Sequence, residues 1–133
     1  MSNSGSFTAT FTVLEGAPLK KDFNASEFSV DPNAPPKRTY SISAYEKSST
    51  SNRTFRFTFS PELASGTYEL EEGQIETYFA EEHYGFSIIK SSLTVTIDSI
   101  SGIYTGTFRT AMLDRYDREV IANGKFDLKV IPN

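Results

Sequence analysis

Phenylalanine alternates with polar residues in RTFRFTFS, residues 53–60, and this period of two constrains the fold more than any other feature of the chain. Successive side chains of a β-strand point to opposite faces, so Phe55, Phe57 and Phe59 would share one face of a strand. The same alternation recurs in residues 6–14, 38–46, 92–100 and 103–113. Aromatic residues make up 14% of the chain and include eleven phenylalanines, which favour pleated, half-buried surfaces. We therefore predict an all-β fold.

Short polar segments separate the alternating runs roughly every 8 to 14 residues, a spacing typical of a sandwich. With 133 residues, the chain fits one domain that spans residues 1–133 and buries a single core. We predict an antiparallel β-sandwich of about seven to nine strands, with a small β-barrel as the alternative. The expected core consists of the apolar members of the alternating runs: Phe7, Phe11, Phe55, Phe57, Phe59, Leu93, Val95, Ile97, Phe108, Phe126 and Leu128.

Two segments have no clear period. Residues 15–37 hold four of the six prolines, so we predict a long loop there, with one turn of helix near residues 24–28. Residues 75–90 are compatible with two short strands around Glu81 to Tyr84, or with a helical turn.

The end of the chain, DREVIANGKFDLKVI (117–131), carries Asn123-Gly124 between two apolar runs. Asn-Gly is the strongest short signal for a two-residue hairpin turn, because both of its residues accept a positive φ. A tight turn there would place Glu119 on the same face as Phe126, at the rim of the core. A three-residue loop would instead bring Val120 opposite Phe126 and Glu119 opposite Asp127, where like charges repel. The tight turn is therefore preferred.

Four short strings follow one another in the second half of the chain: SGTYEL (65–70), LTVTI (93–97), IYTGTF (103–108) and VIANGKFDLKV (120–130). The arrangement resembles a family of bacterial β-sandwich domains of unknown function that are common in cell-envelope lipoproteins. This resemblance implies the sandwich fold for about residues 65–130 and implies no catalytic residues. The chain lacks the lipobox cysteine of such lipoproteins.

Net charge and cysteine content narrow the function classes. The net charge of −4 and the scattered basic residues argue against nucleic acid as a partner, because phosphate contacts need clustered lysine and arginine. The absence of cysteine excludes disulfides, thiol nucleophiles and cysteine-ligated zinc. No apolar run is long enough for a membrane-spanning helix, and the stretch MSNSGSFTATF lacks the charged segment followed by an apolar segment that is typical of a signal peptide. As written, the chain is expected in the cytoplasm, or in the cell envelope or outside the cell if a signal was removed.

Candidate chemistry is sparse, and we expect no cofactor, no metal and no catalytic residue. His83 is the only histidine and no serine lies in a nucleophile-elbow motif. A metal on His83 with Glu81 or Glu82 would lack ligands. Calcium at Asp114 and Asp117 would lack the acidic density of an EF-hand loop.

Function is therefore expected to be non-catalytic binding of a protein or carbohydrate partner. Two alternatives stay open: a small-ligand carrier, which requires a barrel with an apolar cavity, and a carboxylate-based hydrolase, which requires two converging acids. For the hydrolase, the acids to compare are Glu81, Glu82, Asp114 and Glu119.

The predicted binding segment is YFAEEHYGF (78–86), where the alternation breaks down and aromatic residues crowd together. We expect Tyr78, His83 and Tyr84 to be the contact groups, since tyrosine offers apolar area and a hydroxyl. In the alternative interpretation, Tyr78, Phe79 and Phe86 cover one end of the core.

Phe57→Ala tests the predicted core. If Phe57 is buried, its truncation should lower the free energy of unfolding by about 3 to 5 kcal/mol, measured by urea denaturation. A loss below about 1 kcal/mol, or a far-ultraviolet circular dichroism spectrum dominated by helix, would contradict the predicted fold.

Overall fold

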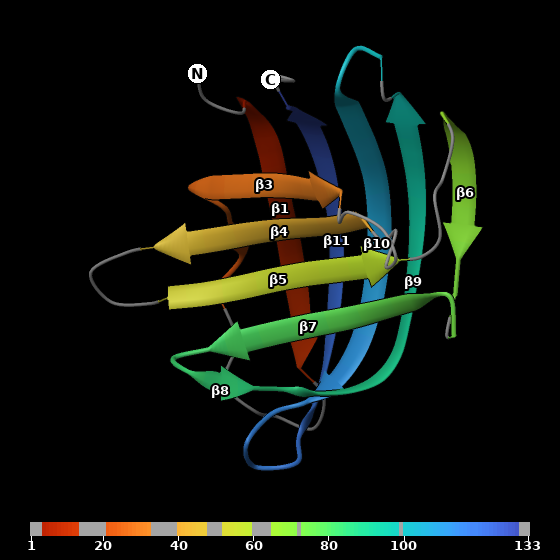
Figure 1. Cartoon of the computed structure of the whole chain (residues 1–133). Helices are drawn as coiled ribbons and strands as arrows, with labels where there is room; N and C mark the ends of the chain where they lie inside the picture. Colours follow the sequence, from red (N-terminus) through yellow and green to blue (C-terminus); the bar gives the residue numbers. More distant parts are fainter. Residues whose placement is uncertain are drawn as a thin grey trace.

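A computed structural model describes residues 4–13, 21–32, 40–47, 52–59, 65–71, 73–98 and 100–130. These residues form two antiparallel sheets that pack face to face (Figure 1). The six-stranded sheet has the order β2 (Phe23–Asn24), β1 (Ser4–Val13), β11 (Glu119–Lys129), β10 (Ile103–Leu113), β9 (Ser87–Asp98) and β6 (Gly66–Leu70). The five-stranded sheet has the order β3 (Glu27–Pro32), β4 (Tyr40–Lys47), β5 (Asn52–Phe59), β7 (Ile75–Glu81) and β8 (Tyr84–Gly85).

The strands of the five-stranded sheet run across those of the six-stranded sheet, which lies behind them in Figure 1. Both sheets end in edge strands, so the fold is a sandwich and not a closed barrel. The predicted all-β sandwich is confirmed. The part of the chain that the structure describes contains no helix long and apolar enough to cross a membrane.

Phenylalanine fills the space between the sheets. All eleven residues predicted for the core are buried there. The ring of Phe7 lies 5.5 Å from that of Phe126 within its own sheet and 5.9 Å from that of Phe55 in the opposite sheet. Phe55 in turn lies 4.5 Å from Phe79. Aromatic pairs at these separations add to the stabilisation from area burial, so one continuous stack of rings joins the two sheets.

The hairpin predicted at Asn123-Gly124 does not exist. β11 runs straight through both residues, and Gly124 pairs with Phe108 on one side and with Ala9 on the other. The true turn is residues 114–118, between β10 and β11. Glu119 therefore points away from the face that carries Phe126, in contrast to the prediction. Val120 shares that face and is fully buried.

Gly124 is needed for space rather than for a turn. A Cβ atom built on Gly124 would lie 2.2 Å from Cζ of Phe108 and 2.6 Å from the carbonyl oxygen of Thr8. Two register positions along the same ladder, a Cβ on Gly106 would lie 2.6 Å from Cζ of Phe126. Each glycine thus leaves room for the phenylalanine ring of the neighbouring strand.

The predicted loop at residues 15–37 is wrong in part, because β2 and β3 lie within it and no helical turn forms at residues 24–28. Alternation had predicted neither strand, since β2 has two residues and β3 ends at a proline. For residues 75–90 the two-strand interpretation is confirmed, with β7 and β8 joined at Glu82 and His83. Ser60, Pro61 and Gly66 in SPELASG (60–66) also predict a single helical turn, and residues 60–64 of this segment lie outside the described residues.

Gly124→Ala should lower the free energy of unfolding by about 1 to 3 kcal/mol, because the new methyl group would overlap the Phe108 ring and the backbone of β1. Gly85→Ala is the matched control, since its Cβ would meet only Cε1 of Tyr78 at an ordinary 3.5 Å. Urea denaturation of the two variants measures the difference. Equal stabilities would contradict the close approach at Gly124.

Candidate functional site

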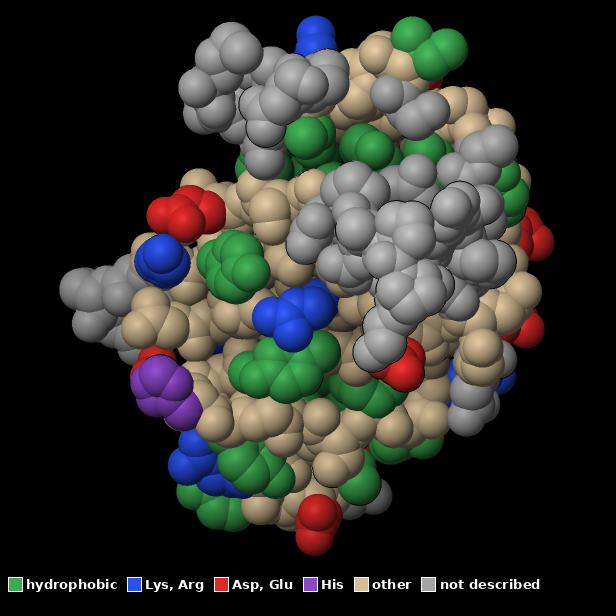
Figure 2. Space-filling view, in the orientation of Figure 1, with side chains coloured by type: hydrophobic (Ala, Val, Ile, Leu, Met, Phe, Trp, Pro, Cys, Tyr) green, Lys and Arg blue, Asp and Glu red, His purple; other side chains and the backbone are tan. Residues whose placement is uncertain are grey.

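Tyr78 and Arg56 form the most exposed aromatic contact on the outer face of the five-stranded sheet. They are cross-strand partners on β7 and β5, and the Arg56 guanidinium lies 5.4 Å from the centre of the Tyr78 ring. The Tyr78 side chain is 43% exposed. Arg56 makes no ion pair with any described residue, so its charge remains available to a ligand. In Figure 2 basic and hydrophobic side chains lie side by side on this face, and the single histidine, in purple, lies at its left edge.

Tyr84 points to the opposite side of the sheet from Tyr78. It is half-buried, and its ring lies 5.9 Å from that of Phe86, which belongs to the core. The Arg115 guanidinium lies 5.2 Å from the centre of the Tyr84 ring. Tyr84 therefore covers one end of the core, a role that the alternative interpretation gave to Tyr78, Phe79 and Phe86. Of those three residues, Phe79 and Phe86 are buried and Tyr78 is exposed.

His83 is exposed on the two-residue turn between β7 and β8. Glu82 and His83 both have a positive φ, 51° and 68°, as a type I′ turn requires, although such turns favour asparagine and glycine. The neighbouring strand holds the turn in place: the Glu82 N–H donates to the Asn52 carbonyl, and Glu82 Oε1 accepts the Asn52 N–H at 3.1 Å. Tyr78, His83 and Tyr84 thus occupy an outer face, a turn and the end of the core, and they do not converge.

Two of the four acidic residues considered for hydrolysis, Asp114 and Glu82, are engaged in local structure. Asp114 is buried, and its Oδ1 accepts the backbone N–H groups of Tyr116 and Arg118, while Oδ2 lies 2.8 Å from Nε of Arg118. Burial raises the pKa of Asp114, but these hydrogen bonds outweigh it and the pKa lies below its ordinary value. The arrangement orders the β10–β11 turn. Within the described residues no three histidine, aspartate or glutamate side chains are grouped so that they could hold a metal.

Arg53 is the only arginine or lysine buried among the described residues, and every part of its guanidinium has a partner. Its Nε lies 2.7 Å from Oε1 of Glu46, and its two terminal nitrogens donate to the carbonyl oxygens of Lys21 and Asp22. The same guanidinium lies 5.7 Å from the centre of the Phe23 ring. Arg53 therefore ties the short strand β2 to the five-stranded sheet, which is a structural role.

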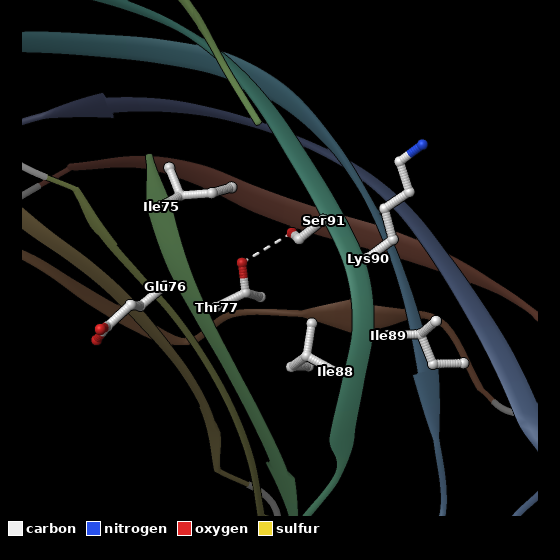
Figure 3. A pocket seen from close by; sticks show the side chains of 7 residues that line it. All are labelled: Ile75, Glu76, Thr77, Ile88, Ile89, Lys90 and Ser91. Atoms are coloured by element: carbon white, nitrogen blue, oxygen red, sulfur yellow. Dashed lines mark hydrogen bonds between the residues drawn. The ribbon is translucent and has the colours of Figure 1, made fainter. Parts of the chain in front are cut away.

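A hollow of about 380 Å³ lies between β7 and β9, where the two sheets diverge (Figure 3). Ile75 and Ile88 point into it from the two strands, and Thr77 Oγ1 donates to Ser91 Oγ at 2.7 Å across it. Ser91 Oγ also lies 2.9 Å from Oγ1 of the fully buried Thr110. The floor of the hollow is thus a chain of hydroxyl groups between aliphatic walls.

Two further hollows lie on the outer face of the six-stranded sheet. One, of about 330 Å³, includes Ser92, Thr94 and Arg109, and the other, of about 460 Å³, includes Thr8, Thr10 and Asn24. Both hollows include Thr107 and Asn123. The smaller hollow is lined mainly by polar side chains, whereas the larger one also includes Ala9 and Phe23 and its lining is mostly apolar.

The sequence missed Arg56, Arg115 and the hollow between β7 and β9. Arg56 lies on the polar side of an alternating strand, where solvation is the ordinary role, and only the register of β5 on β7 puts it over Tyr78. Arg115 reaches Tyr84 from a turn 31 positions later in the sequence. The hollow depends on where the two sheets part, which no local pattern encodes.

No protein-family model, curated protein or solved structure matches this chain. The resemblance to bacterial β-sandwich domains therefore stays a prediction.

Glu46→Gln tests the Arg53 ion pair through its pH dependence. Burial raises the pKa of Glu46, but the hydrogen bonds and charge of Arg53 and the Asn24 N–H outweigh it, so the pKa lies below its ordinary value of 4.5. A carboxyl group whose pKa falls on folding stabilises the protein above its unfolded-state pKa, and this contribution is lost as pH falls through the folded-state pKa.

The parent should therefore be more stable than Glu46→Gln at neutral pH, and the difference should shrink as pH falls below about 4.5, the ordinary value. Melting temperatures of both proteins between pH 7 and pH 3 measure this, with Glu27→Gln, in an exposed pair with Lys47, as the control. A difference that stays constant over this range would rule out the ion pair as its source.

Proposed function

We propose that this protein is a non-catalytic binding domain that contacts a protein or carbohydrate partner through the outer face of its five-stranded sheet. The observation that carries the proposal is the exposed Arg56–Tyr78 pair at the middle of two neighbouring strands. Tyrosine and arginine are the residue types that dominate binding energy at interfaces, and both offer flat surfaces with hydrogen-bonding edges.

The position of the pair on paired strands supports this function. β5 pairs with β4 over residues 52–59 and with β7 over residues 53–59, so Arg56 projects from a strand that is paired on both sides, and Tyr78 projects from the neighbouring strand. A rigid platform loses little conformational entropy when a partner binds. Stacking on the Tyr78 ring also restrains the Arg56 side chain before binding.

The two alternatives receive less support. A carrier needs an enclosed apolar cavity, whereas the sheets here are open at their edges and phenylalanine rings pack between them. A carboxylate-based hydrolase needs two free, converging acids, whereas Asp114 is bound to Arg118 and Glu82 is bound to the backbone of Asn52.

Tyr78→Ala and Arg56→Ala should each weaken partner binding without lowering the melting temperature. A glycan array and a peptide array screened with the parent identify the ligand, and titration calorimetry then measures each variant. For a central contact residue the loss is expected to be about 2 kcal/mol, or about 30-fold in Kd. Arg109→Ala, an exposed arginine on the other sheet, is the matched control and should bind like the parent.

Tyr84→Ala tests whether Tyr84 contacts a partner or covers the core. Because Tyr84 packs against Phe86, its truncation should lower the melting temperature and leave binding to the folded protein unchanged. The proposal is wrong if both Tyr78→Ala and Arg56→Ala bind an identified ligand as tightly as the parent does.

A further inference from the structure

Strand β7 has a free edge along part of its length. β7 pairs with β5 over residues 75–81, but on its other side β8 pairs only with Ala80 and Glu81. No described residue forms a strand pair with residues 75–78 on that side. Four residues of β7 therefore have a strand neighbour on one side only.

The direction of the backbone groups on this edge follows from one hydrogen bond. The Phe79 carbonyl accepts the Phe86 N–H at 2.8 Å, so the polar backbone groups of Phe79 point away from β5. The N–H and C=O of one residue point to the same side of a strand, and successive residues alternate. Ile75 and Thr77 therefore present their N–H and C=O groups to the free edge, while Glu76 and Tyr78 pair with β5.

The hollow between β7 and β9 lies directly beside this edge. The side chains of Ile75 and Thr77 face it from β7, and that of Ile88 faces it from β9 (Figure 3). β9 is also free on this side, because β6 pairs with β9 only from Leu93 onward. The register shift between Ile88 and Lys90 leaves Ile89 unpaired and 46% exposed at the rim.

Glu76 supplies a charge on the outer side of the same edge. Its side chain is exposed and points away from the hollow in Figure 3, on the outer face of the sheet. It makes no ion pair with any described residue. A residue that pairs with Glu76 from outside would share its face, and opposite charges in such cross-strand pairs stabilise a sheet.

We propose that an extended peptide segment of a partner protein adds to the β7 edge as a further strand, antiparallel to β7 and in line with β8. Its backbone hydrogen-bonds to Ile75 and Thr77. Its residue opposite Glu76 is lysine or arginine, and the two flanking residues are apolar and face the hollow between Ile75 and Ile88. The required motif is apolar–basic–apolar over three residues, a pattern that an extended strand displays on alternate faces. This edge site is separate from the proposed binding role of the outer face.

A phage-displayed library of random heptapeptides provides the probe. The enriched peptide is synthesised with a fluorophore, and fluorescence anisotropy gives its Kd for the intact protein. We expect enrichment of the apolar–basic–apolar motif. A selection that yields no such peptide overturns the proposal.

Glu76→Lys tests the charge. It should weaken binding of the enriched peptide by about 5-fold or more, because an attractive cross-strand pair of up to about 1 kcal/mol becomes repulsive. Lys125→Glu, an exposed charge reversal on the six-stranded sheet, is the matched control and should leave the Kd unchanged. An unchanged Kd for Glu76→Lys contradicts the assignment.

Hydrogen exchange tests the backbone contacts without a mutation. In the free protein the amides of Ile75 and Thr77 should exchange faster than those of Glu76 and Tyr78, and the bound peptide should slow Ile75 and Thr77 alone. Slowing elsewhere, without these two, places the peptide at another site and overturns the proposal.

Sedimentation velocity distinguishes a second copy of this chain from a peptide partner. A concentration-dependent dimer that the enriched peptide cannot dissociate would assign the edge to self-association and overturn the proposal. A monomer over the concentrations used, with peptide binding to one site per chain, agrees with it.

Discussion

The close approach of strands β1, β11 and β10 at two glycines is the constraint on which the core depends. Gly124 lies beneath the Phe108 ring and Gly106 beneath the Phe126 ring, and at either position a side chain would collide with a ring. The two pairs lie two residues apart in one ladder and on the same face, so each ring occupies the space above the glycine of the neighbouring strand. Phe7 then stacks on Phe126 with an angle of 8° between the ring planes. The six-stranded sheet thereby gains an inner surface made of aromatic faces.

The five-stranded sheet meets that surface with its own phenylalanines. Phe57 lies 4.8 Å from Phe108, and Phe55 lies 4.9 Å from Phe23 with the rings nearly perpendicular. Offset and edge-to-face pairs of this kind fix the relative position of two sheets more narrowly than aliphatic contacts do, since ring quadrupoles have a preferred geometry. The relative position of the two sheets in turn sets the separation between β7 and β9, and the hollow lies between these two strands.

The surface features that we connect with binding are consequences of the same packing. Since Phe55 and Phe57 face inward, Arg56 must face outward, and the register of β5 on β7 then places it over Tyr78. Because β9 leaves β8 to join the other sheet, β7 loses its neighbour after two residue pairs. The inward-facing phenylalanines of β5 thus account for the exposed Arg56–Tyr78 pair, and the departure of β9 accounts for the free edge of β7.

Alternation and turn residues in the sequence determined the all-β class, most of the strands and all eleven predicted core residues. Those features are local: a period of two needs only the geometry of a single strand. The same reasoning failed at Asn123-Gly124, because the sequence does not distinguish a glycine that leaves space for a ring inside a sheet from a glycine that forms a turn. Strand β2 was missed for a related reason, since its position depends on residues distant in sequence: Glu46 accepts the Asn24 N–H, and Arg53 donates to the carbonyl oxygen of the preceding Asp22.

The candidate site was predicted only in part. Crowded aromatic residues predicted a binding segment at 78–86, and Tyr78 lies exposed within it. Which tyrosine faces solvent and which covers the core depended on the β7–β8 turn at Glu82 and His83, where a positive φ at both residues sends Tyr84 inward. The partners Arg56 and Arg115 come from other strands and turns, so only the tertiary structure could bring them to these rings. Sequence periodicity specifies which side of a strand is apolar, whereas register and sheet divergence arise from contacts between segments far apart in the chain.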